Sequence, residues 1–296
     1  MRQGPECRVL RLKDIRRATN EFAIDNLISE GTFWKSYHGY FSRGRFKGNF
    51  LVKRINKELA ADVESYMFKL EVKDLADCNR HINIISLLGY CVEKNENIMV
   101  YRLRSNGLLY DYLYNDQHNA PRLTELQRLD VCLGVAHGLS YLHMKDILHG
   151  NLTANNIFLD HNMVPRISDM DLAFGIHHIH GTEGYPAPEC YEPGYKPTKQ
   201  ADVYAFGILL LEVLCEKPSW KCLVMLALEF AVKRELPRSG GHELVEVSLS
   251  EECLRACDKR PSMNQVVGEL ELALKLQMDY ENGKANSQQV GCQLYH

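Results

Sequence analysis

Two hydrophobic patterns divide the chain into two regions. In the first, short runs such as "NFLVKRI" and "NIMVYRL" are typical of strands, and they surround one stretch with helical spacing near Ala60–Cys78. After the turn signal Asn106–Gly107, apolar residues recur at helical spacing in the segments 108–114, 122–144, 201–216 and 260–276. We therefore predict an α+β protein with a small β-rich lobe followed by a larger helical lobe.

The two ends of the chain differ from these lobes. Residues 11–20, "RLKDIRRATN", predict a short basic helix, and the polar end "ENGKANSQQVGCQLYH" predicts a loose tail. We expect an N-terminal extension over residues 1–23 and a main domain over residues 24–272. That domain would consist of lobes 24–103 and 104–272, and a flexible tail would cover residues 273–296.

The composition is that of an ordinary folded domain and excludes some partners. The chain of 296 residues is 45% hydrophobic and 25% charged with a net charge of −3, which gives no electrostatic reason to bind nucleic acid or an anionic membrane surface. We expect no signal peptide, because the N-terminus "MRQGPECRVL" has no apolar core. We expect no transmembrane segment, because the longest apolar stretch, Val203–Cys215, contains Glu212 and is too short. The ten cysteines lie scattered through apolar segments, which favours buried free thiols in a reducing compartment.

A series of short motifs follows in a fixed order from about residue 11 to residue 271. They are "ATNEF", "ISEGTFWKSYHG", "LVK", "INIISLLGYC", "IMVYRLRSNGLL", "LSYLH", "GTEGYPAPE", "ADVYAFGILLLEVL" and "KRPSM". This order resembles that of plant receptor-like/Pelle family protein kinases, of the receptor-like cytoplasmic kinase type. The resemblance implies a bilobal protein-kinase fold, with a β-rich N-lobe that includes helix αC and a larger helical C-lobe.

The resemblance implies a nucleotide site of which only part is kept. Lys53 matches the lysine that holds the α- and β-phosphates, and Glu71 matches its glutamate partner on αC. The glycine-rich loop begins at Ser29 and keeps only its middle glycine, Gly31. Trp34 puts an indole where bare backbone should close over the phosphates, which favours a hairpin kept for folding alone.

The adenine pocket is also altered. Leu51 stands where the family has an alanine, Ser36 where it has a valine and Phe158 where it has a leucine. Leu51 and Phe158 would crowd the pocket while Ser36 would open it, so the sequence leaves the net steric outcome open.

The segment "ILHGNLTANNIFLD" keeps the H-x-x-L-x-x-x-N frame of the kinase catalytic loop, but its chemistry differs. Asn151 replaces the aspartate that accepts the proton of the substrate hydroxyl or orients that hydroxyl for attack, and an amide cannot take a proton at neutral pH. Thr153 replaces the lysine that neutralises the γ-phosphate. Asn156 and Asp169 match the two residues that bind magnesium in the family, so they would be the ligands of any Mg²⁺ bound here.

The activation segment shows a matched pair of losses. Gly150 replaces the arginine that grips a phosphate on this segment in active relatives, and the segment itself, "LAFGIHHIH", contains no Ser, Thr or Tyr. Thr182 remains at the family's substrate-positioning position. Asp171 replaces the glycine of D-F-G and adds a carboxylate, which favours repulsion of a triphosphate or a simple change of backbone over cation binding.

The residues that the family uses for architecture are kept. Glu189 is expected to form a buried ion pair with Arg260, Asp202 to anchor the catalytic-loop backbone, and Lys53 to lie close to Glu71. His149, Leu75 and Met170 fit positions of the apolar spine that joins the lobes in the family.

The residues that build the kinase fold are kept, while those that transfer phosphate are replaced. This combination predicts a catalytically inactive pseudokinase. The resemblance implies a scaffold, adaptor or allosteric partner in plant kinase signalling, including immune signalling. It would bind an active receptor-like kinase or an immune receptor complex, in the cytoplasm or peripherally at the plasma membrane through those partners. No cofactor would be required, and weak ATP–Mg²⁺ binding is left open. Two alternatives also stay open: a weak, atypical Ser/Thr kinase that uses Lys53, Asn156 and Asp169, and a nucleotide-binding switch without turnover.

Overall fold

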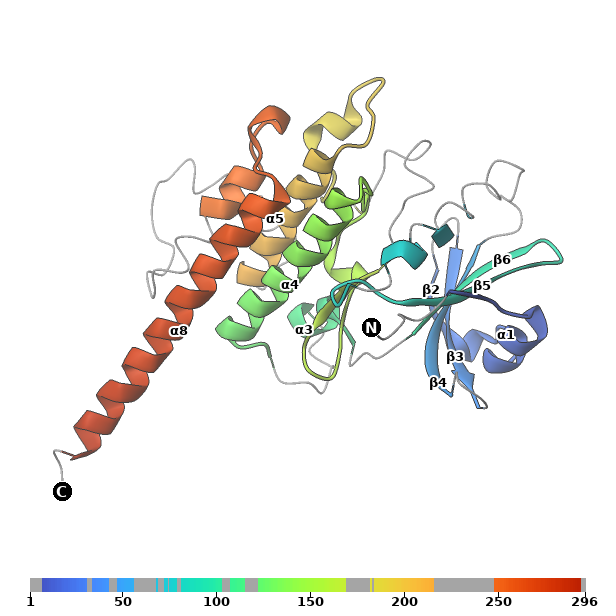
Figure 1. Ribbon diagram of the computed structural model, residues 1–296, viewed down its shortest axis with the longest axis horizontal. Coiled ribbons are helices and arrows are strands. Elements are labelled where there is room, and N and C mark those ends of the chain that lie inside the picture. The colour runs from blue at the N-terminus through green and yellow to red at the C-terminus, as the bar shows by residue number, and fades with distance from the viewer. Residues whose placement is uncertain are drawn as a thin grey trace. The chain divides into compact units, whose positions relative to one another are not determined.

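In the computed structural model, a β-sheet unit is followed along the chain by a helical unit, as predicted (Figure 1). It describes residues 7–30, 34–42, 47–55, 68, 72–73, 75–78, 81–102, 107–114, 122–168, 182, 184–215 and 248–293. The described residues up to Arg102 belong to the first compact unit, and those from Gly107 onward belong to the second. The predicted mixed α+β class is therefore confirmed.

A six-stranded sheet forms the framework of the first unit. The strand order is β1-β5-β6-β4-β3-β2, in which β1 runs parallel to β5 and all other neighbours are antiparallel. The strands are β1 (Arg8–Val9), β2 (Leu27–Glu30), β3 (Trp34–Phe41), β4 (Gly48–Ile55), β5 (Leu87–Glu93) and β6 (Glu96–Arg102). Because β4 lies between β3 and β6, its residues 50–53 are buried.

The N-terminal segment packs on one face of this sheet. Helix α1 (Leu12–Ala18) confirms the predicted basic helix, and a short 3₁₀ helix, η1 (Ile24–Asn26), follows it. Leu12 and Ile15 are spaced three residues apart, so they share one face of α1 and join a buried cluster with Val52. The charged residues of α1 therefore fall on its other faces.

A helical stretch lies between β4 and β5. Phe68, Val72, Leu75 and Cys78 are helical and buried, and their spacing of three and four residues places them on one helix face. They confirm the helix predicted near Ala60–Cys78, although the rest of that stretch, including Glu71, lies outside the described residues.

Helices dominate the second unit. They are α3 (Leu109–Tyr114), α4 (Glu125–Met144), α5 (Lys199–Cys215) and α8 (Met263–Gln293), with the 3₁₀ helices η4 (Ala154–Asn156), η5 (Pro188–Tyr191) and η6 (Cys257–Lys259). A small antiparallel sheet has the order β7 (Gly107–Leu108), β8 (Ile157–Leu159) and β9 (Pro165–Ile167). A capping box starts α4: Thr124 Oγ1 accepts from the Gln127 N–H, and the Gln127 side chain accepts from the Thr124 N–H.

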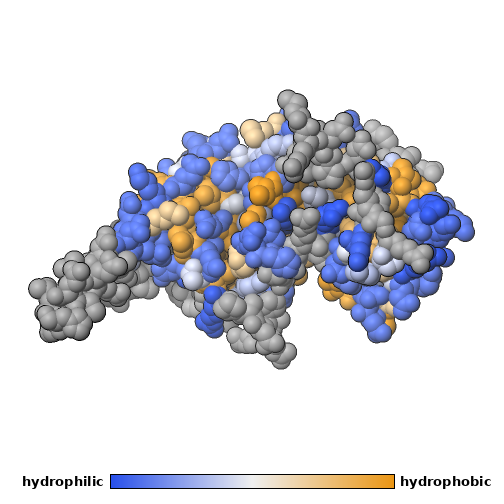
Figure 2. Space-filling model, turned by 60° about the horizontal axis from the view of Figure 1, so that its bottom comes forward, coloured by the Kyte–Doolittle hydropathy of each residue, from blue (hydrophilic) through white to orange (hydrophobic). Residues whose placement is uncertain are grey.

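Helix α5 is the buried helix that the sequence predicts over Val203–Cys215. Phe206, Ile208 and Leu209 are fully buried, and Gly207 allows close packing because a Cβ there would lie 2.7 Å from the Cβ of Cys253. Among the described helices, none combines the length and apolar character needed to cross a bilayer. The face shown in Figure 2 is largely hydrophilic, with smaller hydrophobic patches between the polar residues.

Seven cysteines of the described segments are free thiols, and five of them are buried. The buried ones are Cys78, Cys91, Cys132, Cys190 and Cys253. Burial raises the pKa of Cys91 to about 11 and that of Cys253 to about 12, so both stay protonated and unreactive at neutral pH. For these residues the prediction of buried free thiols is confirmed.

The C-terminal end differs from the loose tail expected from residue 273, because α8 continues to Gln293. Leu270, Ala273 and Gln277 are buried at a spacing of three and four residues, so the buried face of the helix extends past the expected boundary. Gln277 Nε2 donates to Glu125 Oε2 on α4 at 3.2 Å, and this hydrogen bond ties the extension to the neighbouring helix.

Candidate functional site

The residues expected to hold a nucleotide fall in both units, and each set is described on its own. In the first unit, Trp34 covers the ammonium group of Lys53. Ser36 on β3 pairs directly with Lys53 on β4, so Trp34, two residues earlier on β3, projects from the same face of the sheet. Lys53 Nζ lies 5.0 Å from the centroid of the indole, within the range of a cation–π interaction. The indole thus occupies one side of the group that the resemblance assigns to the α- and β-phosphates.

Beside this pair, the sheet buries an unpaired hydroxyl. Ser36 is 2% exposed, and its Oγ has no hydrogen-bond partner in the part of the chain that the structure describes. Such an atom costs ~1–3 kcal/mol, which a polar ligand or a water molecule would offset. Leu51 lies two residues before Lys53 on β4, so it lines the same face and is also buried. Ser36 therefore favours a small polar ligand here, whereas Trp34 opposes a phosphate.

In the second unit, the carboxylate of Asp202 accepts hydrogen bonds from the backbone of the loop 149–156. It lies in the first turn of α5 and is 3% exposed. Its Oδ2 accepts the His149 N–H at 2.8 Å and lies 3.0 Å from His143 Nε2, while its Oδ1 accepts the Gly150 N–H at 2.8 Å. Gly150 has φ 77°, a left-handed backbone conformation that glycine adopts without strain. Asp202 therefore anchors the loop, as the resemblance implies.

His149 is fixed as one neutral tautomer. The Asn151 N–H donates to His149 Nδ1 at 3.2 Å, so Nδ1 is the acceptor of the ring. Nε2 then carries the proton and donates to the carbonyl oxygen of Ser168 at 3.0 Å. His149 is fully buried, and it joins the loop to the segment that follows β9.

Asn151 stands at the position of the family's catalytic aspartate, and its side-chain oxygen is already occupied. Oδ1 accepts the hydroxyl of Thr182 at 3.1 Å and its backbone N–H at 3.4 Å. A backbone N–H can only donate, so the atom that faces it must be the amide oxygen. The other side-chain atom, Nδ2, is a donor and cannot take a proton from a substrate hydroxyl.

Thr153 and Asn156 complete the loop without supplying a cation. Thr153 is 1% exposed, and its Oγ1 has no hydrogen-bond partner within the described segments. Asn156 Nδ2 donates to the carbonyl oxygen of Asn151 at 2.8 Å, which leaves the amide oxygen as the group that could bind a metal ion. No group of three or more His, Cys, Asp or Glu residues in the described ranges could hold a metal.

Glu189 and Arg260 form the predicted ion pair. Both nitrogens of the guanidinium fork donate to the carboxylate, with Arg260 Nη2 at 2.9 Å from Glu189 Oε2. Arg260 also donates from Nη1 to the carbonyl oxygen of Gln200 at 3.0 Å and from Nε to that of Arg255 at 2.8 Å. Its side chain is 1% exposed, and this hydrogen-bonded guanidinium lowers the pKa of Glu189.

A second buried contact was not predicted. The Tyr185 hydroxyl donates to Glu212 in the last turn of α5 and accepts the Ala154 N–H at 3.4 Å. Burial, together with the neighbouring Glu212, raises the pKa of Tyr185 well above its usual value. The signal available in the sequence is a single charged residue, Glu212, within the apolar stretch Val203–Cys215, because a buried charge requires a hydrogen-bond donor.

Several predicted site residues lie outside the described residues. These are Gly31, Glu71, Asp169, Met170, Asp171 and the segment 172–180. The expected proximity of Lys53 to Glu71 therefore stays a prediction. Ser29 lies on β2, Phe158 is buried on β8, and Leu75 is buried in the helical stretch before β5.

Comparisons with known proteins agree with this geometry. The family model for protein tyrosine and serine/threonine kinases matches residues 22–270. A probable receptor-like protein kinase of Arabidopsis thaliana is 33% identical in an alignment 310 residues long, gaps included. The alignment covers 94% of this chain and 34% of that protein. The Arabidopsis receptor-like protein kinases FERONIA and HERK 1 are 32% and 33% identical, over 94% and 89% of this chain and 34% of each relative. The chain thus spans about a third of the length of these curated relatives. It belongs to the protein tyrosine and serine/threonine kinase family, and plant receptor-like protein kinases are among its homologues.

Proposed function

We propose that this chain is a pseudokinase that acts in plant kinase signalling by binding protein partners and does not transfer phosphate. The observation that carries the proposal is Asn151, whose side-chain oxygen accepts two hydrogen bonds from Thr182. An amide cannot act as a general base, and a general base typically contributes ~10²–10⁴-fold to a rate. Hydrogen bonds to Asp202 and Thr182 hold the loop in place, but the loop lacks a carboxylate that would accept the proton of a substrate hydroxyl.

Charge stabilisation of a phosphoryl group is also reduced. Thr153 supplies no cation where the family has a lysine, and the ammonium of Lys53 already contacts an indole. Phosphoryl transfer depends almost entirely on positioning and electrostatic stabilisation, so these two changes add to the loss at Asn151. The described residues therefore fit a magnesium-bound triphosphate poorly.

A role through surfaces follows from what the fold keeps. The Glu189–Arg260 pair and the contacts of Asp202 and Tyr185 stabilise the helical unit without contributing chemistry. The relatives are named as receptor-like protein kinases, so we propose an active receptor-like kinase or an immune receptor complex as the partner. Such a partner would place this chain in the cytoplasm, beside the plasma membrane.

A nucleotide-responsive switch is the second candidate. Lys53 and Asn156 are kept, and the buried hydroxyl of Ser36 has no hydrogen-bond partner in the described part of the chain. ATP binding without turnover would satisfy that hydroxyl and could alter a docking surface. A magnesium-dependent rise in melting temperature with ATP, absent in Lys53→Ala, would favour this candidate.

Complementation of a plant line that lacks this protein tests the proposed function. Lys53→Ala and Asp169→Ala should each restore the wild-type phenotype at normal protein abundance, because the proposed function requires neither phosphate transfer nor ATP. Charge reversals across one exposed face of the helical unit should fail to restore it at the same abundance. If both active-site variants fail while the protein accumulates normally, the scaffold role is wrong.

A further inference from the structure

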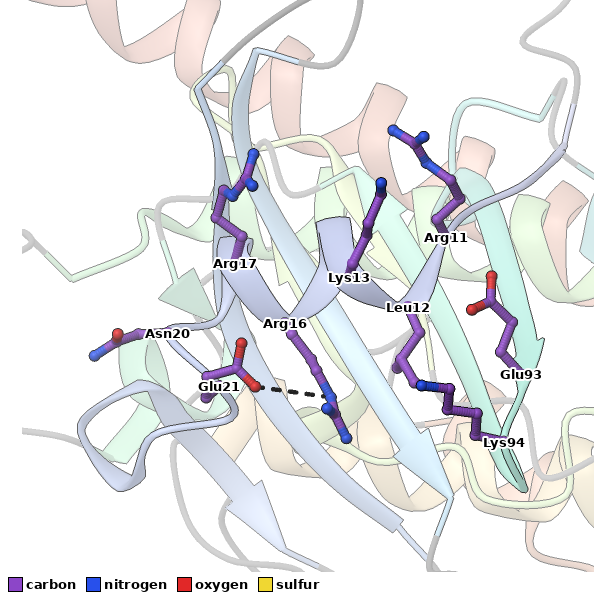
Figure 3. Close-up of a pocket in the computed structure, with 9 residues that line it drawn as sticks. All are labelled: Arg11, Leu12, Lys13, Arg16, Arg17, Asn20, Glu21, Glu93 and Lys94. Carbon is purple, nitrogen blue, oxygen red and sulfur yellow. Dashed lines mark ion pairs between the residues drawn. The ribbon is translucent and has the colours of Figure 1, made fainter.

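A basic pocket opens beside α1 in the first unit (Figure 3). Its volume is about 660 Å³, and five cationic side chains line it: Arg11, Lys13, Arg16, Arg17 and Lys94. Two carboxylates, Glu21 and Glu93, also line it. The cations come both from α1 with its N-terminal flank and from the turn between β5 and β6, so they surround the space from more than one element.

The packing of α1 against the sheet determines which of its side chains are exposed. Leu12 and Ile15 are buried against the sheet, which leaves Lys13 and Arg17 exposed on another face of the helix. These two residues are four positions apart, and like charges at this spacing destabilise a helix. An anion between them would remove that repulsion.

Much of this positive charge has no counterion among the residues that the structure describes. Arg11 Nε lies 2.8 Å from Asp14 Oδ2, and Arg16 Nε lies 3.7 Å from Glu21 Oε2, the pair joined in Figure 3. The latter distance is too long for a hydrogen bond, and the buried Nε of Arg16 has no hydrogen-bond partner in the described chain.

The remaining cations are free of ion pairs. Within the described residues, Lys13, Arg17 and Lys94 form no ion pair. The pocket therefore combines three uncompensated charges with one unmet guanidinium donor.

This pocket is separate from the face that carries Lys53. Val52 packs in the same buried cluster as Leu12 and Ile15, so its side chain points toward α1. Successive side chains of a strand point to opposite faces, and Lys53 therefore projects from the other face of the sheet. Helix α1 also lies before residue 22, where the match to the kinase family model begins.

We propose that this pocket binds a multiply phosphorylated cyclic polyol of the inositol phosphate type, either free or as the headgroup of a phosphoinositide lipid. The pocket volume falls in the range of roughly 300–1,000 Å³ that is usual for small-molecule sites. Arginine forks bind phosphate through paired hydrogen bonds, and the five lining cations on two elements can pair with more than one phosphate. The hydroxyls of the ring would donate to Glu21 and Glu93. A peptide with a single phosphate would leave most of the cations unpaired.

Calorimetric titration of the full chain with inositol trisphosphate tests the proposal. The double variant Lys13→Glu/Arg17→Glu should weaken binding at least about tenfold, because it removes charge-assisted hydrogen bonds. Neither residue makes an ion pair in the described structure, so the fold should tolerate the change. Lys259→Glu/Lys275→Glu carries the same change in net charge at exposed positions of the second unit and should bind as the wild type does. Absence of wild-type binding, or equal weakening in both double variants, would overturn the proposal.

Vesicle sedimentation identifies the source of the ligand and excludes other partners. Binding to phosphatidylcholine vesicles that contain phosphatidylinositol bisphosphate, displaced by inositol trisphosphate and lost in Lys94→Glu, would support the lipid headgroup. Binding of the trisphosphate alone, with the same loss in Lys94→Glu, would support the free anion. Equal binding to phosphatidylserine vesicles of matched charge, or tighter binding of a singly phosphorylated peptide, would contradict the proposal. Lys53→Ala should bind the trisphosphate and the vesicles as the wild type does, because Lys53 projects from the face of the sheet opposite to α1.

Discussion

The ammonium of Lys53 lies 5.0 Å from the centre of the Trp34 ring, on the neighbouring strand. A lysine at this position is usually taken as a sign of nucleotide binding. In this chain the lysine is buried, and the neighbouring strand provides an aromatic partner for it. Its presence is therefore compatible with a structural role.

Trp34→Gly should increase the affinity for ATP–Mg²⁺. A cation–π interaction is worth ~0.5–2 kcal/mol, so removal of the indole would strengthen phosphate binding by about 2- to 30-fold. The measurement is the ATP-dependent shift in melting temperature, with each variant compared with its own nucleotide-free sample. Trp34→Phe retains a ring and should behave more like the wild type. An identical shift in all three proteins would show that Trp34 does not control access to Lys53.

Arg260→Ala should strongly destabilise the protein. It leaves Glu189 without its partner, and breaking a buried ion pair in this way costs ~3–5 kcal/mol. Urea unfolding of the two proteins measures the difference. Lys199→Ala removes an exposed pair with Asp146 in the same unit and serves as the control, with little expected change. A similar small effect of both substitutions would contradict the structural role of Arg260.

The same pair predicts a dependence of stability on acid pH. The Arg260 hydrogen bond lowers the pKa of Glu189 in the folded protein below its ordinary value of 4.5. Its contribution to stability is therefore complete above about pH 4.5 and is lost as the pH falls through the lower, folded-state pKa. The free energy of unfolding should decline over this acid range with a shallower slope in Arg260→Ala. Parallel slopes in the two proteins would exclude the pair as the source.

Asp202→Asn should loosen the loop 149–156 without a change in side-chain size. Both oxygens of Asp202 accept backbone N–H groups of the loop, and the amide nitrogen of asparagine cannot accept. An unpaired buried group costs ~1–3 kcal/mol, so the amide of His149 or Gly150 should exchange its hydrogen about 5- to 150-fold faster. Asp130→Asn, at an exposed position of α4, is the control. Unchanged protection of both amides would show that Asp202 does not hold the loop.

The sequence predicts the fold and one buried ion pair well because both depend on patterns that are local or fixed by the motif order. The spacing of apolar residues locates α4 and α5, and the "APE" and "RPSM" motifs identify Glu189 and Arg260. The partner of Trp34 could not be predicted, because it depends on the register of β3 against β4. The Tyr185–Glu212 contact also depends on tertiary packing, since no periodic pattern links residues 27 positions apart.

Asn151→Asp alone should not restore phosphate transfer. A carboxylate oxygen can accept both hydrogen bonds from Thr182, so the substitution should not disturb the loop. Thr153 would still supply no cation for the γ-phosphate. Trp34 would still cover the Lys53 ammonium group and hinder its contact with a phosphate. The readout is incorporation of labelled phosphate into a generic substrate with Mg²⁺. Strong activity in this single variant would mean that the other changes do not impair catalysis.

The central claim is that the wild-type chain transfers no phosphate, and incorporation of labelled phosphate from ATP tests it most directly. The purified chain, with Mg²⁺ or Mn²⁺, should label neither itself nor a generic substrate above the level of Lys53→Ala and Asp169→Ala. Clear incorporation by the wild type that both substitutions abolish would contradict the account and identify an active, atypical kinase.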